Sequence, residues 1–281
     1  MSSRLQNLLD ARLALRDAQS VRESDAAYEF AAPPNLGFPH RLFVPTCYEP
    51  RYAYPLVVWL HSDGSSEYEL DSVMESMSVR NYVAVSPRAH RMTKHNSRLF
   101  RWGTNIADLA IAEDFVIDSV NEVSESLSIA PDRVFVAGFG TGGSVAQWLS
   151  LRHPHRFAGG ISINGPFPKI KRALSHWKSA KGVPVLFMQG SDSGSCAVEE
   201  TVGAMKMAHA AGLNYRFVRF ETEEGREEST SSAMGLSSGS LDVEMLRAAD
   251  RFMMGIVTGT EIPIAPEQPS SSVAVTLFSE N

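Results

Sequence analysis

PDRVFVAGFGTGG, residues 131–143, is the stretch that decides the fold. The apolar run at 134–137 predicts a β-strand, and the residues from Ser144 onward are typical of a helix. A glycine-rich turn, 138–143, joins the two. In an open parallel sheet, ligands bind beyond the carboxyl ends of the strands, so this turn is the first place to look for chemistry.

The segments on either side of this turn repeat the same alternation of strand and helix. Strands are predicted at 41–44, 55–60, 82–85, 134–137, 158–163, 183–188 and 215–220. Helices are predicted around 112–123 and at 144–151, 170–179, 198–211 and 241–256. Residues 130–132 (APD) are predicted to be the breaker that ends the helix around 112–123. Helices between successive strands predict an α/β fold with a mainly parallel, doubly wound sheet of about seven or eight strands.

We predict one main domain, at residues 23–257, with an extension at each end. Leucines at helical spacing predict an N-terminal amphipathic helix over 1–22, which either packs on its own domain or mediates homo-oligomer or partner contacts. Residues 258–281 are predicted to be a flexible C-terminal tail, and 229–240 a flexible loop.

Net charge, apolar segments, cysteines and missing motif residues argue against several classes of function. The 281 residues carry a formal net charge of −6, which argues against nucleic acid as a partner. The N-terminus has no apolar signal region and no later stretch gives about 18 consecutive apolar residues, so we expect a cytoplasmic protein without a membrane span. Cys47 and Cys196 are expected to be reduced thiols. The glycine turn lacks the lysine of a phosphate loop, and His153 and His155 have no accompanying carboxylates, so we expect neither cofactor nor metal.

Five stretches together resemble one superfamily. They are VVWLHSDG (57–64), SPR (86–88), PDRVFVAGFGTGG (131–143), SLRHPHRFAGGISING (150–165) and VLFMQGSD (185–192). The chain resembles the α/β-hydrolase superfamily, within it the phospholipase/carboxylesterase branch, and also feruloyl-esterase and polyhydroxybutyrate-depolymerase-type enzymes. The resemblance implies an α/β-hydrolase sheet with a nucleophile elbow, G-x-S-x-G, at 138–142.

The catalytic triad implied by the resemblance is degenerate. The nucleophile position falls on Gly140, which has no side chain, while the acid position falls on Asp192. The base position falls on Arg226 in one register or Ser240 in another, and arginine stays protonated. His209 is the one histidine after Asp192, and it lies in a predicted helix. Thr141 and Ser144 are poorly placed to replace the nucleophile, so whether the chain is an enzyme stays open at this point.

Two further features concern ligand binding. The resemblance implies that the backbone N–H groups of Asp63 and Thr141 form an oxyanion hole, which predicts a small carboxylate or ester-like ligand. The basic run 88–101 is either a solvated surface or an anion-binding lid that faces the acidic run 220–228. Its cationic residues are Arg88, Arg91, Lys94, Arg98 and Arg101.

The sequence therefore favours a non-catalytic hydrolase homologue, a pseudo-esterase that keeps a ligand- or partner-binding pocket. One alternative is an active carboxylic-ester hydrolase with a non-standard site, in which Asp192 assists attack by water. A second alternative is a structural subunit of a larger assembly.

Overall fold

The computed structural model describes residues 38–93, 98–167, 180–190, 198–220 and 241–260. Its strands are β1 (His40–Phe43), β2 (Tyr54–Leu60), β3 (Val83–Pro87), β4 (Arg91–Met92), β5 (Phe100–Arg101), β6 (Ile129–Phe139), β7 (Gly159–Ile163), β8 (Val185–Gly190) and β9 (Tyr215–Phe220). Its helices are α2 (Glu69–Met77), α3 (Ile106–Ser126), α4 (Thr141–Arg152), α5 (Val198–Ala210) and α6 (Val243–Thr258), with a 3-10 turn, η2, at Ala180–Gly182. The predicted N-terminal helix, the helix at 170–179, the loop at 229–240 and residues 261–281 lie outside the described residues.

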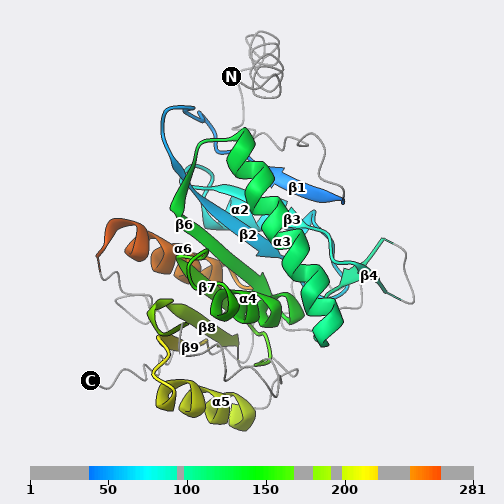
Figure 1. Ribbon diagram of the computed structural model, residues 1–281, viewed down its shortest axis with the longest axis vertical. Helices are drawn as coiled ribbons and strands as arrows, with labels where there is room; N and C mark the ends of the chain where they lie inside the picture. Colours follow the sequence, from blue (N-terminus) through cyan, green and yellow to red (C-terminus); the bar gives the residue numbers. More distant parts are fainter. Residues whose placement is uncertain (1–37, 94–97, 168–179, 191–197, 221–240, 261–281) are drawn as a thin grey trace, which may run out of the picture.

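Seven strands form one sheet in the order β1-β3-β2-β6-β7-β8-β9 (Figure 1). Only the edge pair β1–β3 is antiparallel, and the other neighbours in this sheet run parallel. The predicted doubly wound α/β sheet of about seven or eight strands is therefore confirmed. Because the strands are parallel, the turns after β2, β6, β7 and β8 all leave the same edge.

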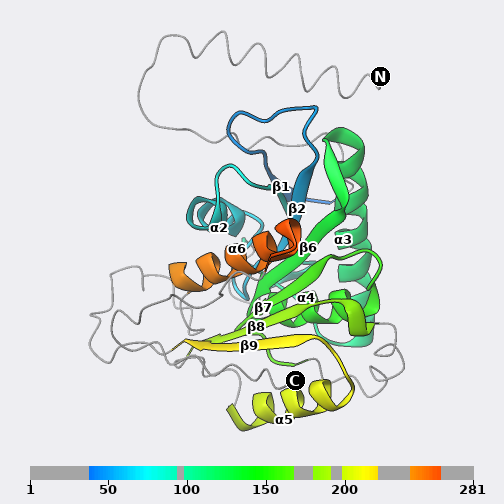
Figure 2. The same ribbon diagram turned by 90° about the vertical axis from the view of Figure 1, so that its left-hand side faces the viewer.

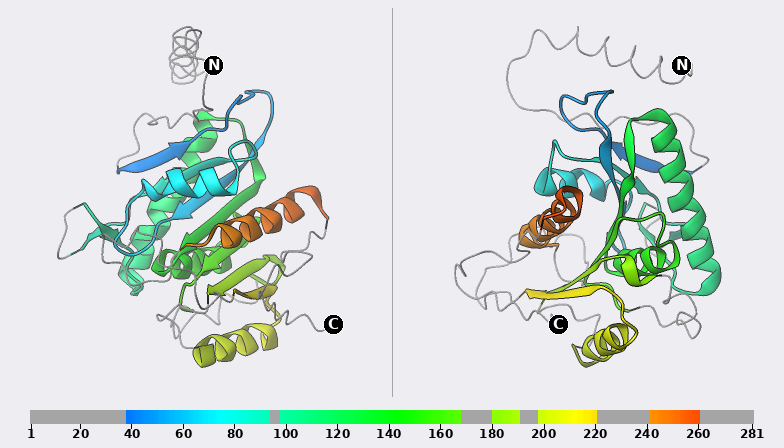
Figure 3. Two further views of the ribbon diagram at one scale, coloured as in Figure 1. Left: turned by 180° about the vertical axis from the view of Figure 1, so that it is seen from behind. Right: turned by 60° about the vertical axis from the view of Figure 1, so that its left-hand side comes forward.

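Helices cover both faces of this sheet, which Figure 2 shows nearly edge-on. Helices α2 and α6 pack side by side on one face, as Figure 3 shows from behind, and α3 and α4 cover the other. Strand β2 is buried along its whole length, with Val57 and Trp59 in the core on the α2/α6 face. Leu56, Val58 and Leu60 belong to the core on the α3/α4 face. This double burial explains why the strand reads as a continuous apolar run.

Three features of the chain differ from the sequence prediction. Helix α2 was not predicted, and the basic run after β3 contains a two-stranded sheet, β4–β5, where a loop was expected. Strand β6 begins at Ile129, so Pro131 and Asp132 lie within it. The preceding helix ends at Ser126, ahead of residues 130–132 as predicted, but the strand starts earlier than predicted: β6 pairs with β2 at Tyr54–Ile129, then shifts register and resumes at Leu56–Val134. The irregularity accommodates the extra residues without ending the strand.

Candidate functional site

The turn between β6 and α4 has the backbone of a nucleophile elbow. Gly140 has φ 57° and ψ −127°, a conformation that side-chain-bearing residues adopt only under strain. Its N–H donates to the carbonyl of Ile163 at 2.8 Å, which fixes the turn against the end of β7. Among the described residues, no heavy atom lies within 4 Å of the place a Cβ at Gly140 would take. The position therefore has room for a side chain and holds none.

The flanking glycines have the opposite environment. A Cβ on Gly142 would lie 2.2 Å from the carbonyl oxygen of Leu60, and one on Gly138 would lie 2.8 Å from that same atom. Both glycines are thus needed for the close approach of the elbow to the end of β2. The packing glycines of the G-x-S-x-G pattern are retained, whereas the central side chain is missing.

Neighbouring hydroxyl groups are committed to other contacts. The Thr141 hydroxyl donates to Asp63 Oδ1 at 2.5 Å, and the Ser144 hydroxyl donates to the carbonyl of Pro166. Ser144 is also buried, at 2% exposure. Neither residue presents a free, accessible nucleophile at the elbow.

The turn after β2 brings the Asp63 side chain to the elbow. We expected Asp63 to act only through its backbone N–H, yet its carboxylate contacts the first residue of α4. Burial raises the pKa of Asp63, while the hydrogen bond from Thr141 and the positive charge of Arg101 oppose that rise. The sequence identified the position, but no local pattern pointed to Thr141 as the partner of this side chain.

His61 holds the β2 turn against the segment that follows β3. Its Nε2 accepts from the backbone N–H of Ala89 at 3.1 Å, so Nδ1 carries the proton and donates to the carbonyl of Ser62 at 2.8 Å. Burial lowers the pKa of this histidine, in keeping with a neutral ring. Trp102 donates to the His61 carbonyl at 3.1 Å. With both ring nitrogens occupied, His61 has a structural role.

Glu69, which the sequence analysis did not single out, fixes the same turn from the start of α2. Its carboxylate accepts from Trp59 Nε1 at 2.9 Å, from the Ser62 hydroxyl at 2.5 Å and from the Ser62 backbone N–H at 3.1 Å. This contact crosses from the strand to a helix that was not predicted, so the sequence alone could not reveal it.

The basic run is anchored by acids from other elements. Arg88 makes a two-pronged ion pair with Glu67, whose side chain is 2% exposed, and the Arg88 guanidinium lies 4.6 Å from the centre of the Phe100 ring. Arg91 and His90 both donate to Asp108 Oδ1 at 2.9 Å. Arg98 has interactions of its own, Arg101 is exposed in β5, and Lys94 lies outside the described residues. Arg88 and Arg91 are thus engaged by acids of the same domain, which the pattern of charges within 88–101 could not indicate.

The contacts of His90 and Arg91 with Asp108 should make the stability of the fold depend on pH. Burial opposes ionisation of Asp108, but the hydrogen bonds from His90 and Arg91 outweigh it, so its pKa lies below the ordinary 3.8. A depressed pKa stabilises the fold at neutral pH, and that contribution is lost as the pH falls from about 4 through the folded-state pKa. We expect Asp108→Asn to lower the free energy of unfolding by about 2 kcal/mol at pH 7 and by much less at pH 3. Urea unfolding of both proteins at the two pH values measures this, and an equal difference at both would contradict it.

The predicted acid and base positions were not placed. Asp192, Arg226 and Ser240 lie outside the described residues, so the assembly of the degenerate triad stays a prediction. His209 lies on α5, in the helix predicted for it, and is exposed.

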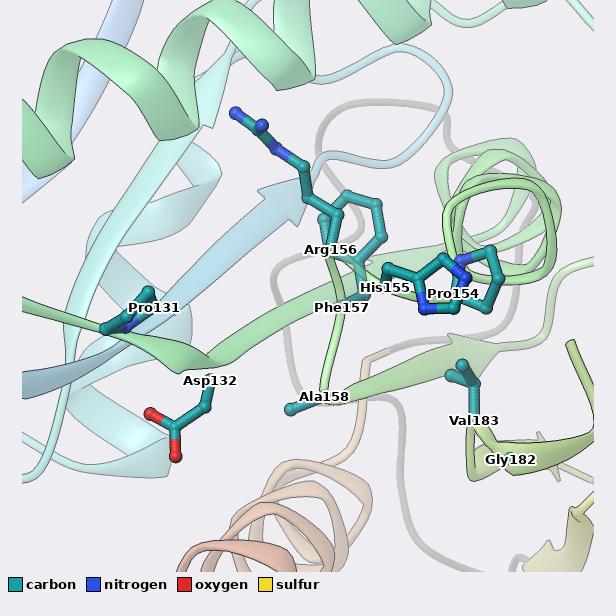
Figure 4. Close-up of a pocket in the computed structure, with 9 residues that line it drawn as sticks. All are labelled: Pro131, Asp132, Pro154, His155, Arg156, Phe157, Ala158, Gly182 and Val183. Carbon is teal, nitrogen blue, oxygen red and sulfur yellow. The ribbon is translucent and has the colours of Figure 1, made fainter. Parts of the chain in front are cut away.

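A separate pocket of about 410 Å³ lies at the opposite edge of the sheet (Figure 4). Its lining comes from the residues at the amino ends of β6, β7 and β8, among them Asp132, His155 and Val183. Arg156 extends toward α3, where it donates to Asn121. No group of three or more potential metal ligands, here or elsewhere, occurs among the described residues. Nor does any helix within those ranges have the length and apolarity to cross a membrane.

The sheet order and the elbow define an α/β-hydrolase fold, and residues 51–234 match the family model Phospholipase/Carboxylesterase. This chain belongs to that family. A putative esterase, NocK, from Nocardia uniformis subsp. tsuyamanensis is 32% identical over 77 residues, which is 27% of this chain and 22% of that protein.

Solved structures agree on the fold. SOBER1 from Arabidopsis thaliana has a TM-score of 0.58 at 20% identity, over 73% of this chain and 100% of that one. A carboxylesterase from Mesorhizobium loti has a TM-score of 0.58 at 14% identity, over 81% of this chain and 99% of that one. The match to NocK spans only about a fifth of that protein.

Proposed function

We propose that this chain is a non-catalytic member of the phospholipase/carboxylesterase family that binds a small ligand at the elbow edge of the sheet. The observation that carries the proposal is Gly140, which holds the strained elbow conformation without a side chain to form an acyl-enzyme. Glycine adopts that conformation without the strain that a serine would bear. The backbone of the site is retained and its reactive group is not.

The lack of a general base at the elbow, among the described residues, supports the same proposal. His61 uses both ring nitrogens, and no described histidine is hydrogen-bonded to the hydroxyl of Thr141 or Ser144, which donate to Asp63 and Pro166 instead. A triad needs a histidine that can take the nucleophile's proton and return it to the leaving group. No histidine follows His209 in the sequence, and Arg226 cannot accept a proton.

The alternative with activity is an ester hydrolase that activates water without an acyl-enzyme, and family membership is what favours it. In such an enzyme, Asp192 would assist the attack of water on the ester. The cytoplasmic location, and oligomer or partner contacts through residues 1–22, stay predictions from the sequence.

Labelling with a fluorophosphonate tests the proposal, because this reagent phosphonylates activated serines. We expect the intact mass of the natural protein to stay unchanged under conditions that fully label an active serine esterase. Two double variants restore a serine and a histidine at the implied triad positions. They are Gly140→Ser/Arg226→His and Gly140→Ser/Ser240→His, one for each candidate position of the base. Stoichiometric labelling of one serine or threonine in the natural protein would contradict the proposal.

A further inference from the structure

The side chain of Asp63 places a negative charge beside the vacant nucleophile position. Asp63 Oδ1 accepts from Thr141 Oγ1 at 2.5 Å, and Thr141 is the residue directly after Gly140. The carboxylate therefore stands at the two residues whose backbone N–H groups were expected to hold an oxyanion. Among the described residues, no atom lies within 4 Å of the Cβ position of Gly140, and the bond from Thr141 brings the Asp63 carboxylate to the residue that borders this space.

This charge has little compensation within the described part of the chain. Arg101 attracts the Asp63 carboxylate from a distance, but no ion pair within 4.0 Å joins the two among the described residues. His61 is neutral, because its Nε2 accepts a hydrogen bond. Asp63 Oδ2 accepts no hydrogen bond within these ranges, and it is not among the buried polar atoms that lack a partner. It therefore remains available to a ligand.

The sequence had suggested an anionic or ester-like ligand on the basis of backbone donors alone. The N-terminus of a helix such as α4 carries the equivalent of about half a positive charge. An ionised Asp63 carboxylate carries a full negative charge at the same turn, so the balance at the elbow favours a cation.

We propose that the open space over Gly140 takes a small protonated amine, whose ammonium group binds the Asp63 carboxylate. This inference rests on the proposed function, because the space is free only in a site that lacks a nucleophile side chain. An ammonium–carboxylate hydrogen bond is charge-assisted and about twice as strong as a neutral one. Burial raises the pKa of Asp63. A partly desolvated carboxylate is stabilised in its ionised form by a neighbouring cation.

A pair of probes with the same ring and opposite charge tests the charge preference. Benzylammonium and benzoate are titrated separately at pH 7 into the full-length protein, and the backbone amide signals of Gly140 and Thr141 are followed by NMR. We expect benzylammonium to bind the natural protein at least about tenfold more tightly than benzoate. In Asp63→Asn, which retains an acceptor for the Thr141 hydroxyl, we expect that preference to disappear.

Glu244→Gln is the matched control, because it removes one negative charge at an exposed position on α6. It changes the net charge as Asp63→Asn does, so its tenfold preference should persist. Tighter binding of benzoate by the natural protein would overturn the inference. So would an unchanged preference in Asp63→Asn, or titrations that leave both amide signals unmoved. Those results would leave the non-catalytic proposal standing, whereas ester turnover would refute that proposal whichever probe bound.

Discussion

Gly142→Ala is expected to destabilise the protein by about 3 kcal/mol or more, or to prevent its recovery as a folded chain. The added Cβ would lie 2.2 Å from the carbonyl oxygen of Leu60 and 2.6 Å from that of His61. Both are backbone atoms at the end of β2, so neither can move aside without disturbing the centre of the sheet. Urea unfolding followed by circular dichroism measures the effect.

Two other glycines supply controls for the same substitution. Gly203 lies exposed in α5 with no described atom within 4 Å of an added Cβ, so Gly203→Ala should stabilise the protein by about 0.5–1 kcal/mol. Gly140→Ala has the space but not the backbone conformation, and should cost about 1–3 kcal/mol. If Gly142→Ala unfolded at the same urea concentration as Gly203→Ala, the close approach of the elbow to β2 would be wrong.

Arg88→Met is expected to lower the free energy of unfolding by about 3 kcal/mol. The substitution keeps most of the side-chain volume over Phe100 but leaves the Glu67 carboxylate, 2% exposed, without its cationic partner. Burying an unpaired charge costs far more than the net contribution of an ion pair in water. Thermal and urea unfolding at pH 7 test this result.

Arg247→Met is the control for the loss of an arginine from an ion pair. Arg247 pairs with Glu244 on the surface of α6, with side chains 59% and 43% exposed. Exposed pairs of this kind contribute little, so the change should stay within about 0.5 kcal/mol. Equal effects of Arg88→Met and Arg247→Met would mean that the basic run is not anchored through Glu67.

The central strands were predictable because burial on both faces of the sheet requires apolar residues at every position of the strand. Residues 55–60 and 134–137 are continuous apolar runs, since alternate side chains enter the cores on opposite sides of the sheet. Helix α2 was missed although its buried residues, Leu70, Val73, Met74 and Met77, recur at helical spacing. The helix has only nine residues, and Tyr68 caps it without a side-chain hydrogen bond, so neither its length nor its start marked it as a helix.

The candidate site was predictable in its backbone but not in its side-chain partners. The glycine turn identified the elbow, and the position of Gly140 followed from the G-x-S-x-G pattern. The contacts of Asp63 with Thr141 and of Arg88 with Glu67 join residues 78 and 21 positions apart. Such pairings depend on the order of the strands, which the sequence did not specify.

A non-catalytic chain should not turn over esters. Hydrolysis of short and medium p-nitrophenyl esters by the natural protein tests this, with a heat-denatured sample and Asp192→Ala measured beside it. We expect the natural protein to release p-nitrophenol no faster than the heat-denatured sample. Saturable turnover by the natural protein that is lost in Asp192→Ala would contradict the claim and establish a hydrolase that works without a nucleophile at position 140.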